Sequence, residues 1–172
     1  MGMDVYGDNP SSEVGEYFRS NVWWWRPLAD YCQAVAPDAC SGCEYWHTND
    51  GDGLDATAAA RLEVALREEL RTGRTSVYAL AYTTSLASLP RQECEFCDGT
   101  GTRQDAVGVS LNMHRKVIEH PPNHLRIGQT GWCNGCDGTG STKSITASYP
   151  FGVDFVEDFA EFVANSGGFK IW

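Results

Sequence analysis

The chain has 172 residues, a formal net charge of −10 at pH 7 and a pI of about 4.7. A phosphate backbone is bound mainly by clustered Lys and Arg, and the 13 such residues form no run, so we expect no general nucleic-acid binding. No apolar stretch approaches the roughly 20 residues that cross a bilayer, and the first ten residues lack the segments of a signal peptide. We therefore expect a cytoplasmic protein without a membrane span, whose seven Cys are metal ligands or free thiols.

The first half of the chain is predicted to be mainly helical. Pro27 fits the first position of a helix. Asp55 is a good N-cap for a second helix, and Gly73 supplies the C-terminal stop of that helix. The predicted elements, in chain order, are an extended start, a helical turn at 13–19, a helix at 27–35, a loop at 38–54, and helices at 56–72 and 76–88.

The short linker Gly73-Arg74 indicates that the helices on either side of it form an antiparallel hairpin. The remaining predicted elements are strand segments at 106–111 and 116–118, a strand at 144–149, a helix at 153–164 and a last strand at 169–172. The predicted fold class is α+β, a small irregular globule with about four helices, short antiparallel strands and a zinc-stapled insertion. Residues 1–172 form a single domain in this prediction, with 91–143 as an inserted zinc-binding module.

Two eight-residue segments predict a metal site. They read Cys94-Glu-Phe-Cys97-Asp-Gly-Thr-Gly and Cys133-Asn-Gly-Cys136-Asp-Gly-Thr-Gly. Two thiolates three residues apart can reach one ion, and two such pairs complete a tetrahedral shell of four cysteines around zinc. The glycines after each pair permit a positive φ, so that backbone N–H groups turn toward sulfur. Because four protein ligands leave no place for a catalytic water, the predicted site is structural.

Residues 94–101 and 133–140 resemble the repeated CxxCxGxG zinc motif of DnaJ-type chaperones. Those chaperones carry four repeats and two zinc ions, whereas this chain has two repeats, enough for one ion. It also lacks the His-Pro-Asp signature of a J-domain. The resemblance therefore implies the metal site and does not imply chaperone activity.

A second metal site is a further possibility. Its ligands would be Cys32, Cys40, Cys43 and His47, whose spacing suits a site of three cysteines and one histidine. The alternative is that Cys32 is buried and the other two thiols lie in a loop. The Gly/Asp-rich stretch 49–53 invites comparison with a calcium loop, but the Glu required at its twelfth position is missing. We expect a turn there that leads into the helix cap, with a looser calcium site as the alternative.

The run Trp23-Trp24-Trp25-Arg26 is the most unusual segment of the chain. Three consecutive side chains cannot point the same way on a helix or strand, so we expect one tryptophan in the core and another at the surface. Indole rings stack on nucleobases, and a nearby arginine can bind phosphate. The alternative is that these aromatics fill the core. The predicted ligand-binding residues are Arg19, Trp23, Trp24, Arg26, Trp46, Asn49 and Asp50.

The opening of the chain is similar to small proteins of tailed bacteriophages. The similarity rests on Asp4-Val5-Tyr6-Gly7, on the sequence GEYFRSNVWWWRPL at 15–28, on both cysteine motifs and on the ending SYPF at 148–151 through Gly167-Gly168-Phe169. It implies a phage-encoded protein acting in the host bacterial cytoplasm.

Two functional hypotheses follow, both non-catalytic, since no catalytic motif gives a reason to propose an enzyme. In the first, a non-catalytic, zinc-stabilised binding protein counteracts host defence by sequestering a nucleotide-like small ligand. In the second, an acidic inhibitor or adaptor binds a basic host protein. A homo-oligomer is compatible with both. A metal-dependent enzyme, which would need an open coordination position on the zinc, is a third alternative.

Overall fold

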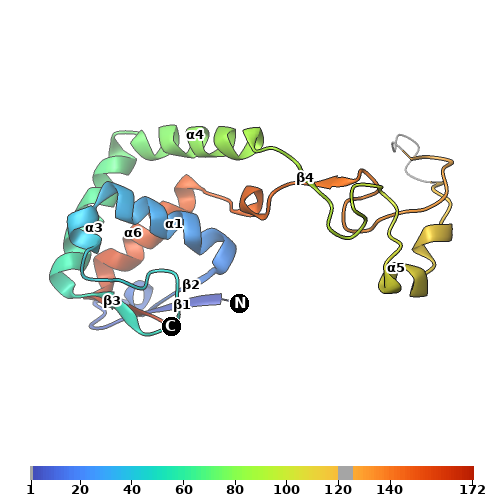
Figure 1. Ribbon diagram of the computed structural model, residues 1–172. Helices are drawn as coiled ribbons and strands as arrows, with labels where there is room; N and C mark the ends of the chain where they lie inside the picture. The colour runs from blue at the N-terminus through green and yellow to red at the C-terminus, as the bar shows by residue number, and fades with distance from the viewer. Residues whose placement is uncertain (1, 120–125) are drawn as a thin grey trace. The chain divides into compact units, whose positions relative to one another are not determined.

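The computed structural model describes residues 2–119 and 126–172, which divide into two compact units. The first unit comprises residues up to 87 together with 148–172, and the second unit comprises residues 88–147. The predicted insertion, 91–143, falls inside the second unit. Figure 1 shows that both ends of the chain belong to the first unit. No helix in the described ranges is long and apolar enough to cross a membrane.

The fold class is α+β, as predicted: the described residues form six α-helices and two small antiparallel sheets. A four-stranded sheet in the first unit has the order β2-β1-β6-β3. Its strands are β1 (Gly2–Gly7), β2 (Tyr17–Asn21), β3 (Asp52–Leu54) and β6 (Phe169–Ile171). Because successive residues of a strand face opposite sides, Met3 and Val5 are buried whereas Tyr6 is exposed. One face of the sheet therefore belongs to the core.

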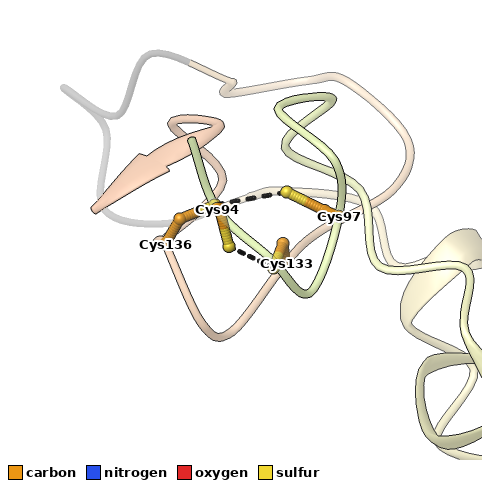
Figure 2. Close-up of side chains that lie close together, drawn as sticks. All are labelled: Cys94, Cys97, Cys133 and Cys136. Atoms are coloured by element: carbon orange, nitrogen blue, oxygen red, sulfur yellow. Dashed lines mark hydrogen bonds between the residues drawn. The ribbon is translucent and has the colours of Figure 1, made fainter. Parts of the chain in front are cut away.

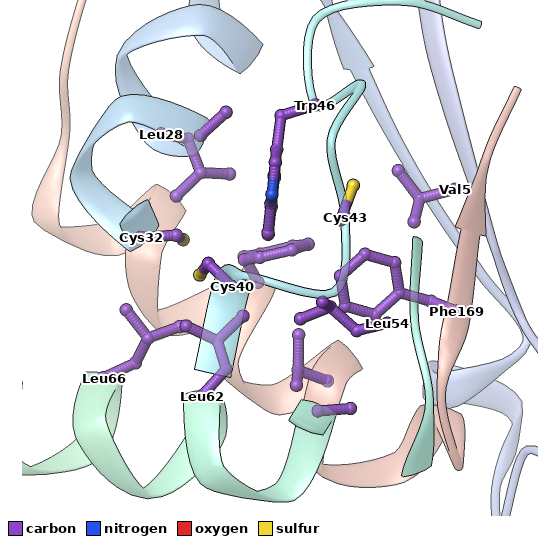
Figure 3. Packing of buried hydrophobic residues seen from close by; sticks show 14 of the residues in the cluster. Val5, Leu28, Cys32, Cys40, Cys43, Trp46, Leu54, Leu62, Leu66 and Phe169 are labelled. Atoms are coloured by element: carbon purple, nitrogen blue, oxygen red, sulfur yellow. The ribbon is translucent and has the colours of Figure 1, made fainter. Parts of the chain in front are cut away.

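Helices cover that face and supply most of the core of the first unit. The first unit has the helices α1 (Val22–Val35), α2 (Pro37–Cys40), α3 (Ala56–Arg71), α4 (Arg74–Ser88) and α6 (Val153–Ser166), of which α1, α3 and α6 contact strands of the sheet. On α6, Val156, Phe159 and Val163 share a buried face, as its helical spacing predicts. These residues pack with Leu62 and Leu66 of α3 in one cluster. Figure 3 shows part of this cluster around Trp46 and Phe169.

The beginning of the chain differs from the prediction. Within the predicted turn, only Glu13–Gly15 is helical, as a short 3-10 turn, and residues 17–19 belong to strand β2, which pairs with β1. Helix α1 starts at Val22 rather than at Pro27, because the Asn21 side chain accepts hydrogen bonds from the N–H groups of Trp23 and Trp24. Pro27 consequently lies inside the helix.

Helix α3 begins and ends where its sequence signals place it, whereas α4 begins at Arg74, two residues before the predicted start. The Asp55 carboxylate accepts a 2.8 Å bond from the N–H of Ala58, and Gly73 has φ of +74° after the end of α3. Helix α4 does not run back along α3, however (Figure 1). Its Tyr78 instead packs on Tyr31 of α1, with ring centroids 4.7 Å apart. The predicted antiparallel hairpin is therefore absent from the described part of the chain.

The second unit is mostly loops, with β4 (Gln92–Glu93) paired to β5 (Ser141–Thr142). The strand predicted at 106–111 is wrong: Ala106–Ser110 is helix α5, because the Asp105 carboxylate caps it through the N–H of Gly108. The strand predicted at 144–149 is wrong as well, since Ile145–Ser148 is a 3-10 helix. The predicted strand character of 116–118 corresponds, in the described residues, to one isolated antiparallel bridge between Val117 and Thr130.

Candidate metal centre

Four cysteines that are far apart in the sequence meet in the second unit (Figure 2). The Sγ atoms of Cys94 and Cys133 are 3.8 Å apart, and those of Cys97 and Cys136 are 3.7 Å apart. All four sulfurs lie within 4.8 Å of one another, and all four side chains are buried. The pairing of β4 with β5 adjoins this cluster, because the N–H of Cys94 donates to the carbonyl of Gly140.

These distances suit a metal ion. Four sulfurs at about 2.3 Å from a tetrahedral zinc ion stand about 3.8 Å from one another. The two short S···S distances of Cys94–Cys133 and Cys97–Cys136 match that edge length. Tetrahedral sites of four thiolates hold zinc or iron in proteins. The described part of the chain therefore contains one site whose donors fit zinc.

Both cysteine motifs fold in the same way. The N–H of Gly101 donates to Cys97 Sγ at 3.3 Å, and the N–H of Gly140 donates to Cys136 Sγ at 3.2 Å. Both glycines have positive φ, +74° and +78°. A Cβ atom at Gly140 would also lie 2.1 Å from the carbonyl oxygen of Gly99, so the two motifs interlock where only glycine fits. These N–H groups stabilise the negative charge of thiolate ligands.

The threonine of each motif closes the turn, a role that the sequence argument did not assign. The Thr100 hydroxyl donates to the carbonyl of Cys97 at 2.6 Å, and the Thr139 hydroxyl donates to the carbonyl of Cys136 at the same distance. Asp98 and Asp137, which precede the glycines, also adopt positive φ. The identical Asp-Gly-Thr-Gly sequence after each pair was the signal for both features.

Two arginines bind the outside of the site. Arg126 donates to the carbonyl of Thr100 at 2.8 Å and to the hydroxyl of Thr102 at 2.9 Å, and thereby joins the long loop to the first motif. The Arg103 guanidinium lies 4.7 Å from the ring centroid of Phe96 and donates to Asn134 Oδ1 at 3.1 Å. It therefore connects the middle residues of the two CxxC pairs.

The thiols themselves have perturbed acidity. Burial raises the pKa of Cys97 to about 12 and raises the pKa of Cys133 as well. Burial also acts on Cys136, but the Gly140 N–H and the neighbouring thiols outweigh it and lower the pKa of that thiol. In the absence of a cation, Cys97 and Cys133 stay protonated at neutral pH. A metal ion must therefore displace protons to bind here.

The second predicted set of metal ligands is not assembled. Within residues 2–119 and 126–172, the Cys94 cluster is the one group of His, Cys, Asp or Glu with three or more ligand atoms within 4.8 Å of one another. Cys32, Cys40 and Cys43 lie instead in the apolar core of the first unit (Figure 3). The Nε2 atom of His47 is 3.0 Å from an oxygen of Asp30. Cys32 is buried, as the alternative stated, but Cys40 and Cys43 are buried as well, and Cys40 ends helix α2 rather than lying in a loop.

The Asp52 side chain holds the backbone around the segment 49–53 by hydrogen bonds, and no cluster of metal ligands is found there among the described residues. The Asp52 carboxylate accepts hydrogen bonds from the backbone N–H groups of Glu44, Tyr45 and Gly53 at 2.7–2.9 Å. The N–H group of Tyr45 is the largest cause of the lowered pKa of this carboxyl, since it favours the charged form. The predicted turn is therefore only partly right: residues 50 and 51 bend, whereas Asp52–Leu54 form strand β3, which pairs with β6 before the Asp55 cap.

The predicted ligand-binding residues do not line one pocket. Arg19 and Trp24 share a cavity of about 270 Å³. Trp46 is a core residue, 1 % exposed, and its carbonyl accepts a 2.6 Å bond from the Trp25 indole. Trp23 is 39 % exposed and contacts the ring of Tyr149, so one tryptophan of the run is in the core and another is at the surface. The other predicted residues, Arg26, Asn49 and Asp50, are exposed and do not line that cavity.

Comparison of the chain with known protein families, curated proteins and solved structures finds no match. The resemblance to phage proteins therefore stays a prediction from the residues that carry it. The similarity of residues 94–101 and 133–140 to chaperone zinc repeats is limited to those motifs. The geometry of the four cysteines supports metal binding without reference to either resemblance.

Proposed function

We propose that the protein is a non-catalytic zinc-binding protein in which one Zn²⁺ ion, held by Cys94, Cys97, Cys133 and Cys136, folds residues 88–147. The observation that carries the proposal is the convergence of four buried sulfurs with two edges of tetrahedral length. A closed shell of four protein ligands leaves no position for a reacting water or substrate. The role of the ion is therefore to hold the fold.

The second unit depends on such an ion because it has little apolar core of its own. Apart from the four cysteines, the buried hydrophobic residues described in it are Ile118 and Trp132. Small modules of this kind commonly fold only with their metal, and the free energy of zinc binding, on the order of 10 kcal/mol, then acts as folding free energy. Metal binding and the order of the second unit are therefore coupled.

Removal of the metal is expected to unfold the second unit and leave the first unit folded. The measurement is a two-dimensional ¹⁵N–¹H NMR spectrum of the zinc-loaded chain before and after excess chelator. We expect the amide signals of residues 88–147 to collapse to random-coil positions, while those of α3 and α6 keep their dispersion. Added Zn²⁺ should restore the spectrum. A chelated, zinc-free chain with an unchanged spectrum contradicts the proposal.

A second candidate function concerns the acidic surface. Residues 88–147 contain six of the 13 Lys and Arg and six of the 23 Asp and Glu. The rest of the chain holds the other seven basic and 17 acidic residues, and hence the entire net charge of −10. We infer that the first unit binds a basic partner protein, which in a phage-encoded chain would be a host protein. Binding to a basic peptide that weakens steeply with added salt supports this function, and salt-independent binding opposes it.

Sequestration of a nucleotide is less well supported. Of the residues predicted to bind the nucleotide, Arg19 and Trp24 line one cavity of the described part of the chain, and Asp154 and Asp158 line it too. Two carboxylates repel the phosphate groups of a nucleotide. We therefore favour a positively charged partner for this part of the molecule, and the role in countering host defence stays a prediction.

A further inference from the structure

Strand β2 forms one edge of the four-stranded sheet, and its outward backbone groups are open. Asp4, the residue opposite Arg19, exchanges both of its backbone hydrogen bonds with Trp172, at 2.8 and 2.7 Å, on the other side of β1. Opposite residues of an antiparallel pair alternate between bonded and non-bonded, so Arg19 and Asp4 form a non-bonded pair. The N–H and C=O groups of Arg19 therefore point away from β1, and within the described residues neither has a hydrogen-bond partner.

Two cavities lie beside the open edge of β2. The cavity of about 270 Å³ lies beside β2, and its lining residues are Arg19, Ser20, Asn21, Trp24, Asp154, Phe155 and Asp158. A second hollow, lined by Gly2, Arg19, Ser20 and Asn21, shares the same strand. Ser20 points toward the core and is 5 % exposed, so a residue placed opposite Ser20 on an added strand would face the first cavity. Backbone bonding and a side-chain pocket therefore meet at one place.

The lining of the first cavity selects a side chain with an apolar stem and a positive end. The rings of Trp24 and Phe155 pack together, with centroids 5.4 Å apart, and provide an aromatic wall. Asp154 and Asp158, from the first turns of α6, are exposed at the same cavity. Arg19, the basic residue of the lining, is 3.7 Å from the carboxylate of Asp4 on the solvent face of the sheet. Lys and Arg side chains combine such a stem with a cation.

We propose that the open edge of β2 binds an extended basic peptide of a partner protein. The peptide adds as an antiparallel strand and exchanges backbone hydrogen bonds with Arg19. Its Lys or Arg side chain opposite Ser20 lies against Trp24 and between Asp154 and Asp158. This inference rests on the proposed binding of a basic partner and names both the site and the form of that partner. It does not depend on the metal site.

The test uses the full-length, zinc-loaded chain and a fluorescent nine-residue peptide of alternating Thr and Val with Lys at its centre. We expect Asp158→Asn to weaken binding about tenfold, the effect of losing one contact to a charged group. The matched control is Glu157→Gln, which removes the same charge from α6 outside the cavity lining and should change affinity less than about twofold. A peptide with norleucine in place of Lys should lose about as much affinity as the Asp158 variant.

The backbone contact is tested separately. N-methylation of the peptide residue opposite Arg19 should abolish binding, and bound peptide should slow hydrogen exchange of the Arg19 amide at least about tenfold. Tolerated N-methylation, or equal losses in the Asp158 and Glu157 variants, overturns the strand-edge site but leaves binding of a basic partner standing. Failure of the Lys peptide and of polylysine to bind at low salt removes both proposals. Dimerisation of the chain through β2 would also overturn the site, since a second copy would fill the edge.

Discussion

Replacing Cys133 by Ser is expected to lower the zinc content from one ion per chain to a small fraction and to unfold the second unit. A serine hydroxyl is a far weaker zinc ligand than a thiolate, and the three remaining sulfurs cannot close the shell. The lost ligand also lies at 3.8 Å from Cys94 in the only cluster of buried residues described for this unit. The measurement is elemental analysis of purified protein together with the NMR spectrum of residues 88–147.

The matched control is Cys32→Ala. Cys32 is equally buried but belongs to the apolar core of the first unit. This variant should keep one zinc ion per chain, with a loss of stability of about 1 kcal/mol from the small cavity. Full zinc content in the Cys133 variant, or equal loss of zinc in both variants, contradicts the assignment of the ligands.

Replacing Trp25 by Ala is expected to destabilise the first unit by about 3–5 kcal/mol. The Trp25 side chain is fully buried, stacks on Trp46 at 6.3 Å between centroids and meets Phe159 edge to face at 5.7 Å. Its indole N–H also donates to the carbonyl of Trp46, which would be left without this donor. Urea unfolding followed by the circular dichroism of the helices measures the change.

Trp23→Ala is the control for this prediction, because Trp23 is adjacent in sequence but 39 % exposed. We expect it to cost less than about 1.5 kcal/mol, mostly from its contact with Tyr149. Both variants should retain one zinc ion per chain, since neither residue belongs to the second unit. Equal destabilisation by the two substitutions is incompatible with the described core.

The features that the sequence predicted correctly are those encoded by short local patterns. The spacing within and after the cysteine pairs was enough to predict that the two pairs share one site, and the glycines of each motif set its own turn. The start of α3 followed from Asp55 and its end from Gly73, again by local capping. Such signals act within a few residues and do not depend on the rest of the fold.

The features that were missed depend on contacts between distant segments or on competing local signals. Strand β2 is stabilised by its pairing with β1, and the sequence of 13–19 does not indicate that partner. The β-branched residues of 106–111 favoured a strand, but the cap from Asp105 to Gly108 stabilises a helix there. Helix and strand propensities alone could not rank these alternatives.

The residues of the second cysteine set, and those predicted to bind a ligand, are not brought together in the described structure, for a related reason. Spacing suggested that Cys32, Cys40 and His47 could converge, but α1 and α2 turn the two thiols into the apolar core, whereas His47 pairs with Asp30. Trp46 likewise packs inside the core and takes no part in a surface pocket. Which face of an element is buried is decided by its packing partners, and the sequence did not specify those partners.

X-ray absorption at the zinc edge, combined with elemental analysis of the full-length chain purified without added metal, tests the central claim most directly. The account predicts one zinc ion per chain, surrounded by four sulfur atoms at about 2.3 Å with no nitrogen or oxygen ligand. A chain without stoichiometric metal, one loaded with iron, or a zinc shell that contains water would contradict it.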